Sequence, residues 1–303
     1  MLQLMRQHWR KICRFSTQVF NDGVLNDFHL SYVGTRCEKM SISIIPEIED
    51  LQACLDFTAQ HHLGWEFNDF MYPDILDNQA EMARLIEIYR SGGLPPTRSL
   101  HGAFLDIAVH SSDSRIRKVS DERVNESIDV ANALACQKVI FHSNFISNYT
   151  TQLYLDNWVS KNVKYWTAKS KQYPDVDLLI ENMFDMTPYL LQRLAEEMSE
   201  VPRFGICLDY AHAEVFGNGT NSCNGFVRSL APYVRHIHLN DCDLRHDLHL
   251  TIGEGMLNWD QFAELYAECM SGASILIEIN GLEQQKRSLD FLQELFARRG
   301  ITL

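Results

Sequence analysis

The chain has 303 residues, of which 46% are hydrophobic and 22% are charged, a composition typical of a globular enzyme with a sizeable core. Its 27 Lys and Arg against 40 Asp and Glu give a net charge of −13, which disfavours binding of nucleic acid through a broad basic face. No apolar run approaches the roughly 18 residues that a membrane-spanning helix needs, so we expect no integral membrane protein.

The first 39 residues differ from the rest in charge. They carry six Lys or Arg and three Asp or Glu, whereas residues 40–303 carry 21 and 37, a net charge of −16. An acid-poor, arginine-bearing start is typical of an organelle transit peptide; the alternatives are a loosely attached extension or an upstream start codon ahead of Met40. We therefore expect residues 1–39 to be an N-terminal extension and residues 40–303 to be a single catalytic domain. The eight scattered cysteines, without a CxxC pair, predict reduced thiols in a cytoplasmic protein, unless residues 1–39 direct import into an organelle.

From Met40 onward, short apolar runs alternate with longer stretches of helical periodicity. The runs that we interpret as strands are 41–45, 65–67, 99–104, 138–142, 177–182, 204–209, 234–240 and 274–280. Helices are expected between them at 50–61, 79–90, 116–135, 153–171, 188–198, 259–270 and 282–298, with a weaker pattern at 226–230. Eight such units in about 260 residues predict an α/β fold of the (β/α)8 TIM-barrel type. An open doubly wound sheet is the competing fold, but the Gly-rich turn expected after its first strand is absent.

Ionisable side chains of metal-ligand type stand at the ends of the predicted strands, where a TIM barrel carries its chemistry. They are His101, His142, Glu181, Asp209, His212, His238, Asp247, His249 and Glu278. A single histidine or glutamate there is explained by a hydrogen bond or a buried arginine, but nine together need cationic compensation, and divalent ions commonly provide it. His, Asp and Glu ligands suit Zn²⁺, Mn²⁺ or Fe²⁺, and nine exceed what one ion needs, so two or three ions are expected. His236 points the same way as His238, and we expect it to support the site from behind.

In this order, and with the motifs CLDYAH around Asp209 and IGEG after His249, the sequence resembles the xylose-isomerase-like TIM-barrel superfamily. This superfamily joins sugar phosphate isomerases and epimerases to endonuclease IV-type enzymes. The resemblance implies a metal set of four ligands at Glu181, Asp209, His238 and Glu278. Endonuclease IV-type enzymes extend this set to three zinc ions, and their additional ligand positions match His101, His142, His212, Asp247 and His249. In that pattern Glu181 bridges two ions, and His212 joins Asp247 and His249 at the third.

Two functions are compatible with these residues. The first is a divalent-metal-dependent phosphoester hydrolase with a di- or trinuclear site, acting on a small molecule of the sugar-phosphate type. Abasic DNA is a poor candidate, because the loop from His238 to Asp247 is shorter than in the DNA-repair enzymes and residues 182–185 lack their Gly-rich stretch. The second is a metal-dependent sugar or sugar-phosphate isomerase or epimerase, in which Glu181 and Glu278 transfer the substrate proton. A non-catalytic binding module is the least favoured.

The remaining expectations concern ligands. We expect one to three ions of Zn²⁺ or Mn²⁺ per chain and a small-molecule sugar or phosphoester as the partner, while an oligomer is left open. Arg245 is a candidate for contacting a substrate phosphate, with a solvated side chain as the alternative. Trp259 is a candidate for stacking on a sugar or base, with core packing as the alternative.

Overall fold

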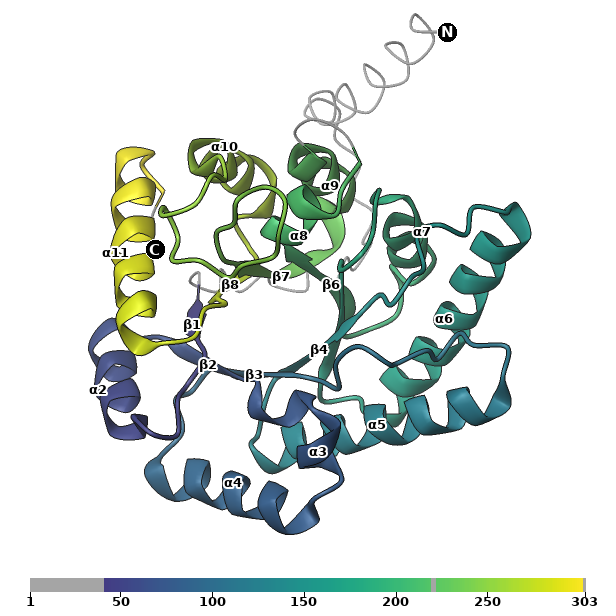
Figure 1. Ribbon diagram of the computed structural model, residues 1–303, viewed down its shortest axis with the longest axis horizontal. Coiled ribbons are helices and arrows are strands. Elements are labelled where there is room, and N and C mark those ends of the chain that lie inside the picture. The colour runs from purple at the N-terminus through teal and green to yellow at the C-terminus, as the bar shows by residue number, and fades with distance from the viewer. Residues whose placement is uncertain (1–40, 219–221, 302–303) are drawn as a thin grey trace, which may run out of the picture. The chain divides into compact units, whose positions relative to one another are not determined.

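The computed structural model describes residues 41–218 and 222–301. Eight parallel strands pair in chain order, and the last strand pairs with the first, which closes the barrel (Figure 1). The strands are β1 (Ile42–Ile44), β2 (Gly64–Phe67), β3 (Arg98–His101), β4 (Lys138–His142), β5 (Asp177–Glu181), β6 (Phe204–Asp209), β7 (Val234–Leu239) and β8 (Ser274–Ile277). The predicted TIM barrel is therefore confirmed, while the extension predicted at 1–39 lies outside the described residues.

Helices surround the barrel at the places that the sequence predicts. They are α2 (Leu51–His61), α4 (Gln79–Gly92), α5 (Ser114–Ala133), α6 (Gln152–Gln172), α7 (Tyr189–Glu197), α9 (Ser222–Leu230), α10 (Trp259–Leu265) and α11 (Leu282–Arg298). The helix predicted at 259–270 divides into α10 and a π-helical turn at Tyr266–Met270. Two short helices were not predicted, α3 (Pro73–Leu76) and α8 (Tyr210–Val215). None of the helices in the described part of the chain is long and apolar enough to cross a membrane.

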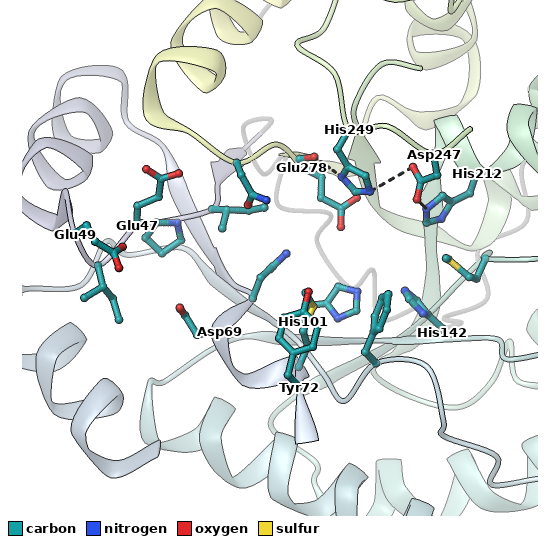
Figure 2. Close-up of a pocket in the computed structure, with 18 residues that line it drawn as sticks. Glu47, Glu49, Asp69, Tyr72, His101, His142, His212, Asp247, His249 and Glu278 are labelled. Atoms are coloured by element: carbon teal, nitrogen blue, oxygen red, sulfur yellow. Dashed lines mark hydrogen bonds and ion pairs between the residues drawn. The ribbon is translucent and has the colours of Figure 1, made fainter. Parts of the chain in front are cut away.

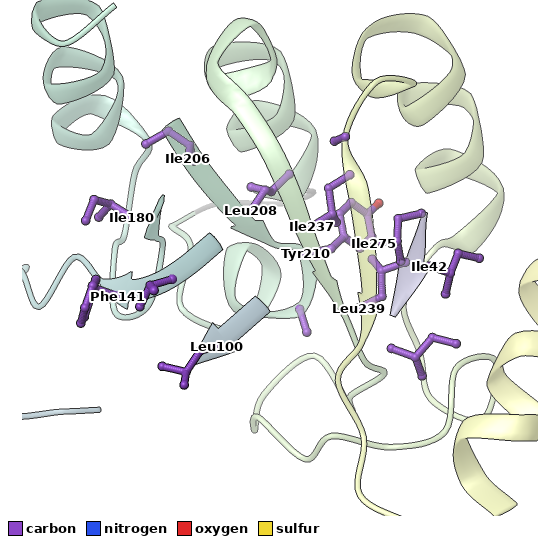
Figure 3. Packing of buried hydrophobic residues seen from close by; sticks show 14 of the residues in the cluster. Ile42, Leu100, Phe141, Ile180, Ile206, Leu208, Tyr210, Ile237, Leu239 and Ile275 are labelled. Atoms are coloured by element: carbon purple, nitrogen blue, oxygen red, sulfur yellow. The ribbon is translucent and has the colours of Figure 1, made fainter. Parts of the chain in front are cut away.

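Side chains of the strands alternate between two environments, because successive residues of a strand point to opposite faces. The outward-facing set packs against the helices and forms most of the hydrophobic core (Figure 3). In β2, for example, the rings of Trp65 and Phe67 both contact Tyr89 of α4, with ring centroids 6.2 and 4.8 Å apart. The inward-facing set of the described strands contributes a small separate cluster of buried apolar residues, Ile140, Leu179 and Cys207, and the buried Leu276. The rest of the barrel interior is therefore available to polar side chains.

Two strands end three residues earlier than predicted, and two candidate ligands stand at these strand ends. The third strand ends at His101 rather than at residue 104, and the eighth ends at Ile277 rather than at residue 280. A Cβ atom at Gly102, directly after β3, would overlap the Phe141 ring, so a residue without a side chain is needed there. His101 is the last residue of β3, and Glu278 directly follows β8.

Candidate metal centre

The nine candidate ligands converge on one end of the barrel, at the carboxyl ends of the strands. Figure 2 shows six of them, namely His101, His142, His212, Asp247, His249 and Glu278. Four of them end consecutive strands, namely His101 on β3, His142 on β4, Glu181 on β5 and Asp209 on β6. His238 lies in β7, Glu278 follows β8, and His212 lies in α8, where the Asp209 carboxylate caps the helix by accepting from the His212 N–H at 2.5 Å. Asp247 and His249 lie in the loop between β7 and α10. The barrel closure thus brings together residues up to 177 positions apart in the chain.

Glu181 lies at the centre of this arrangement, and its side chain is fully buried. Its Oε2 is 3.5 Å from His142 Nε2 and 3.7 Å from His101 Nε2. Its Oε1 is 3.3 Å from His212 Nδ1 and 3.4 Å from His238 Nδ1. One carboxylate therefore faces ring nitrogens from four different elements, two at each oxygen. This is the geometry in which a carboxylate can be shared between two cations.

The donor atoms fall into three groups, and in each group all ligand atoms lie within 4.8 Å of one another. The first group contains His101, His142 and Glu181. The second contains Glu181, Asp209, His238 and Glu278, and the third contains His212, Asp247 and His249. These are the same three sets that the resemblance implies. The geometry permits one ion in each set, and occupation of the three sets stays a prediction.

The third group depends on the loop after β7. Asp247 Oδ2 lies 3.2 Å from His212 Nε2, and Asp247 Oδ1 lies 3.3 Å from His249 Nε2. His249 has a φ of 46°, a left-handed conformation that directs its ring toward the site. His249 Nδ1 donates to the Glu278 carbonyl oxygen at 2.8 Å, and this contact connects the loop to β8. The loop thus adds two candidate ligands, Asp247 and His249, to those that stand at the carboxyl ends of the strands.

The ionisable groups of the cluster are buried and close together, and this shifts their pKa values. Burial raises the pKa of the Asp209 carboxyl to about 8, and the nearby Glu278 and Glu181 carboxylates add to this effect. Burial also lowers the pKa of the His142 ring to about 3, so this ring is neutral and able to bind an ion near pH 7. Burial would raise the pKa of the Glu181 carboxyl too, but His238 and His142 outweigh it and hold the pKa well below its usual value. Glu181 is therefore an anion in a dry interior.

The buried polar atoms of the cluster fit divalent ions. Several have no hydrogen-bond partner in the described chain, namely both carboxylate oxygens of Glu181, both ring nitrogens of His238, His142 Nδ1, Asp247 Oδ1 and Glu278 Oε2. The ion pairs of Glu181, Asp209, Asp247 and Glu278 in the described residues are all with histidines, not with Lys or Arg. Buried unpaired donors and acceptors are costly, and divalent ions bound to His and carboxylate ligands remove that cost.

A pocket of about 420 Å³ opens over the cluster. Six of the candidate ligands line it, namely His101, His142, His212, Asp247, His249 and Glu278, together with Glu47, Glu49, Asp69 and Tyr72. In Figure 2, Glu47 and Glu49 lie at the left of the pocket, and His142, His212 and Asp247 lie at the right. Glu181 does not line the pocket, because its carboxylate is covered by the histidines around it. The lining within the described chain includes no Lys or Arg.

Neither predicted substrate-binding residue lines this pocket. Trp259 is only 6% exposed and packs against Tyr210 and Phe262, while its indole N–H donates to Asp241 Oδ2 at 2.7 Å. Its role in this structure is core packing, so the stacking prediction does not fit. Arg245 is exposed in the loop after β7, outside the pocket lining. Its geometry corresponds to the solvated alternative.

Sequence reasoning missed Glu66 on β2, whose side chain is fully buried inside the barrel. Its Oε1 lies 3.1 Å from His238 Nε2, and its Oε2 lies 3.2 Å from His236 Nε2. The sequence did contain a signal for Glu66. It lies between Trp65 and Phe67, which face outward, so strand alternation points its side chain toward the barrel axis. His236 lies behind His238, as predicted, and its Nδ1 contacts Ser274 Oγ at 2.7 Å. The acidic side of the pocket, with Glu47 and Asp69, was also not anticipated.

The comparison with family models agrees with this architecture. The model of the xylose isomerase-like TIM barrel matches residues 55–295. The chain belongs to the xylose isomerase-like TIM-barrel family. A curated relative, the probable endonuclease 4 of Mycobacterium leprae (strain Br4923), is 24% identical over 212 residues, which cover 64% of this chain and 77% of that protein.

Solved structures of the xylose isomerase-like fold superpose over most of the chain. The TTHB071 protein from Thermus thermophilus, soaked with ZnCl2, gives a TM-score of 0.67 at 23% identity, covering 86% of this chain and 99% of that one. A D-tagatose 3-epimerase-like protein gives a TM-score of 0.66 at 22% identity, covering 85% of this chain and 97% of that one. At these identities the likeness shows the shared fold. The xylose isomerase-like relatives thus include proteins named for epimerase-like and endonuclease activities.

Proposed function

We propose that this protein is a divalent-metal-dependent phosphoester hydrolase with a di- or trinuclear centre, acting on a small molecule of the sugar-phosphate type. The observation that carries the proposal is the grouping of nine His, Asp and Glu side chains into three sets, two of which share Glu181. A single-ion enzyme would use only the set of Glu181, Asp209, His238 and Glu278. The two further sets would then have no chemical task, although they bury charge at considerable cost.

The bound ions, Glu181 and Glu278 would have different roles in such a centre. Divalent ions bound there would lower the pKa of a coordinated water and neutralise charge that develops on the phosphoryl oxygens. Glu181 would hold two cations at a fixed separation, because its oxygens face different histidines at 3.3–3.7 Å. The mixture of imidazole and carboxylate ligands suits Zn²⁺ or Mn²⁺. Glu278, the only carboxylate of the second set that lines the pocket, is positioned to contact the substrate.

The pocket supports a small substrate rather than nucleic acid. Its volume of about 420 Å³ is that of a site for one small molecule. Contacts to a DNA backbone come largely from Lys and Arg, and the described pocket lining has neither. Residues 40–303 also carry a net charge of −16. A relative of this chain is named as a probable endonuclease, but these features favour a substrate whose negative charge is confined to the scissile group.

A second candidate is a metal-dependent isomerase or epimerase of an uncharged sugar. The absence of Lys and Arg from the described pocket lining favours it, as does the fold shared with a D-tagatose 3-epimerase-like protein. In that reaction Glu181 and Glu278 would both have to reach the substrate. Glu278 lines the pocket, whereas Glu181 is fully buried and does not. We therefore rank this function second.

The test is the ion content of the purified protein together with two variants. We expect two or three ions per chain, and we expect His142→Ala and Asp247→Ala each to lose an ion and to lower phosphoester turnover by about 100-fold, because each removes part of the transition-state electrostatics. His246→Ala and Asp243→Ala are matched controls, since this exposed pair lies in the same loop outside the pocket. One ion per chain, with turnover of ketose or aldose sugars that survives both variants, would contradict the hydrolase and support the second candidate.

A further inference from the structure

Glu66 lies inside the barrel, directly beneath the candidate metal centre. Its side chain is fully buried, and its two oxygens have different neighbours. Oε1 faces His238 Nε2 at 3.1 Å. Oε2 accepts from Ser99 Oγ at 2.7 Å and lies 3.2 Å from His236 Nε2. The carboxylate is thus fixed from one side and presents its free oxygen to His238.

His236, which contacts Glu66 Oε2, is itself held in place by a contact to Ser274. His236 Nδ1 lies 2.7 Å from Ser274 Oγ on β8, which also accepts from Lys138 Nζ at 3.0 Å. Strand pairing keeps these residues in register, because Glu66 is paired with Ser99, and His236 is paired with Ser274. A polar network from five strands therefore determines where the Glu66 carboxylate lies.

His238 connects this network to the candidate ligands. Its Nε2 faces Glu66, whereas its Nδ1 lies 3.4 Å from Glu181 Oε1 and 3.4 Å from Glu278 Oε1. The Glu66 carboxylate is the carboxylate nearest to the ring, and its negative charge 3.1 Å from Nε2 stabilises a proton on that nitrogen, which favours the tautomer that leaves the Nδ1 lone pair free. Only this tautomer can donate the Nδ1 lone pair to an ion that Glu181 and Glu278 also hold.

We propose that Glu66 is a positioning residue that fixes the tautomer and orientation of His238, so that Nδ1 faces the ion of the second set. The proposal rests on the metal centre of the proposed function. In metal proteins a carboxylate behind a ligating histidine makes the ring more basic and restrains its rotation, and its loss typically costs roughly 10–100-fold in ion affinity. Glu66 also adds a negative charge behind the cluster, which strengthens its attraction for cations.

Three donors, Glu66, His236 and His238, also lie close enough to bind an ion themselves. The network argues for positioning instead, because Glu66 Oε2 already accepts from Ser99 and His236 Nδ1 is engaged with Ser274. An ion in this triad would also compete with the second set for His238. The two assignments differ in what happens when Glu66 loses its charge.

The decisive variant is Glu66→Gln, which preserves the side-chain volume and removes the charge. The ion-free protein is titrated with Zn²⁺ or Co²⁺ against a chromophoric chelator. We expect the ion of the second set, which includes His238, to bind about 10–100-fold more weakly. The ions of the other sets should keep their affinities, because only His238 depends on Glu66. Ser99→Ala is the graded comparison, since it keeps the charge of Glu66 but removes one contact that fixes its carboxylate. We expect it to weaken the same ion by a smaller factor and to leave the other ions unchanged.

A second readout reports on the tautomer directly. In ¹⁵N–¹H spectra of the zinc form, we expect the wild-type His238 ring to carry its proton on Nε2, and the Glu66→Gln ring to show a mixture of tautomers. Glu66→Asp keeps the buried charge but withdraws the oxygen from His238, so it should show the same selective loss of affinity if the glutamine variant does not fold.

The outcomes separate this inference from the proposed function. Wild-type protein that binds no ion overturns the metal centre, whatever Glu66 does. Wild-type ion content with unchanged affinities and unchanged His238 spectra in both Glu66 variants overturns the positioning role alone. Equal weakening of every ion, with a lower melting temperature of the ion-free protein, shows a merely structural role and also overturns it. Loss of one whole ion with the remaining sites intact and His238 still ligated would assign the triad as an ion site instead.

Discussion

His249 is oriented by both of its ring nitrogens. Nδ1 donates to the Glu278 carbonyl oxygen, so Nε2 faces Asp247 Oδ1. Burial opposes a charge on this ring, but the Asp247 carboxylate outweighs burial and raises the pKa of His249 to about 10. His212 behaves in the same way, because Asp209 and Asp247 outweigh burial and hold its pKa well above the usual value. Both rings are therefore protonated in the ion-free protein at neutral pH.

Ion binding at the third group must release these protons. We expect affinity to rise with pH between pH 6 and pH 8, by about tenfold per pH unit for each proton displaced, because protonated rings cannot act as ligands. Chelator competition at several pH values measures the slope, and a weakly buffered titration counts the protons released. In His249→Gln the slope should be shallower by one proton, and a wild-type affinity that is independent of pH would contradict the assignment of these rings.

At the scale of elements, one buried carboxylate organises the loop between β7 and α10. Asp241 is fully buried, and its backbone pairs with Leu250 in both directions at 2.8–2.9 Å. Its side-chain oxygens accept from four donors, namely the N–H groups of Cys242, Gly253 and Leu257 and the indole of Trp259. Because Asp247 and His249 lie between these anchor points, Asp241 determines where the third group of ligands lies without touching it.

The Asp241→Asn substitution should weaken ion binding at the third group and leave ion binding at the other two groups unchanged. Both carboxylate oxygens of Asp241 accept hydrogen bonds, whereas an amide accepts them only at its single oxygen. We therefore expect the free energy of unfolding to fall by about 2–3 kcal/mol. The ion of His212, Asp247 and His249 should bind more weakly, while the other ions keep their affinities. Denaturant unfolding of the ion-free protein and chelator competition measure the two effects.

Trp259→Phe is the control for this substitution. It removes one of the four donors, so the loss of stability should be about 1 kcal/mol, and KM for the substrate should not change. An increase in KM would restore the prediction that Trp259 contacts substrate. Equal effects of Asp241→Asn on all ions would contradict the separate role of the loop.

The sequence predicts the elements well because each repeat carries its own signal, an apolar run followed by a helical period. The strand-end ligands are visible for the same reason, since a histidine or glutamate at the end of an apolar run is conspicuous. Glu66 was missed because it occurs in a strand of four residues and its partner His236 lies 170 positions away. α8 was missed because its six residues follow β6 without a turn, and its cap, Asp209, is itself a candidate ligand. The buried role of Trp259 depends on Asp241, whose four contacts form only after the loop folds.

At the scale of the whole molecule, the barrel closes through β1, which begins at Ile42 and pairs with both β2 and β8. The family match lies within residues 55–295. We propose that residues 1–39 are dispensable for the barrel. A chain that starts at Met40 should keep the melting temperature, ion content and turnover of the full chain, measured by thermal unfolding, metal analysis and assay. Removal of residues 1–45 is the matched control, since it deletes β1 and opens the barrel, and a loss of ions on removing 1–39 alone would contradict the domain boundary.

The pocket supplies carboxylates from Glu47, Glu49 and Asp69, and its described lining has no Lys or Arg. On the proposed function, the number of ions that the chain carries would therefore set the sign of the electrostatic potential at the pocket mouth. A chain short of ions would repel anions, whereas a fully loaded chain would attract phosphorylated molecules and gain little for neutral sugars. The supply of divalent metal would thus control which compounds enter as well as how fast they react.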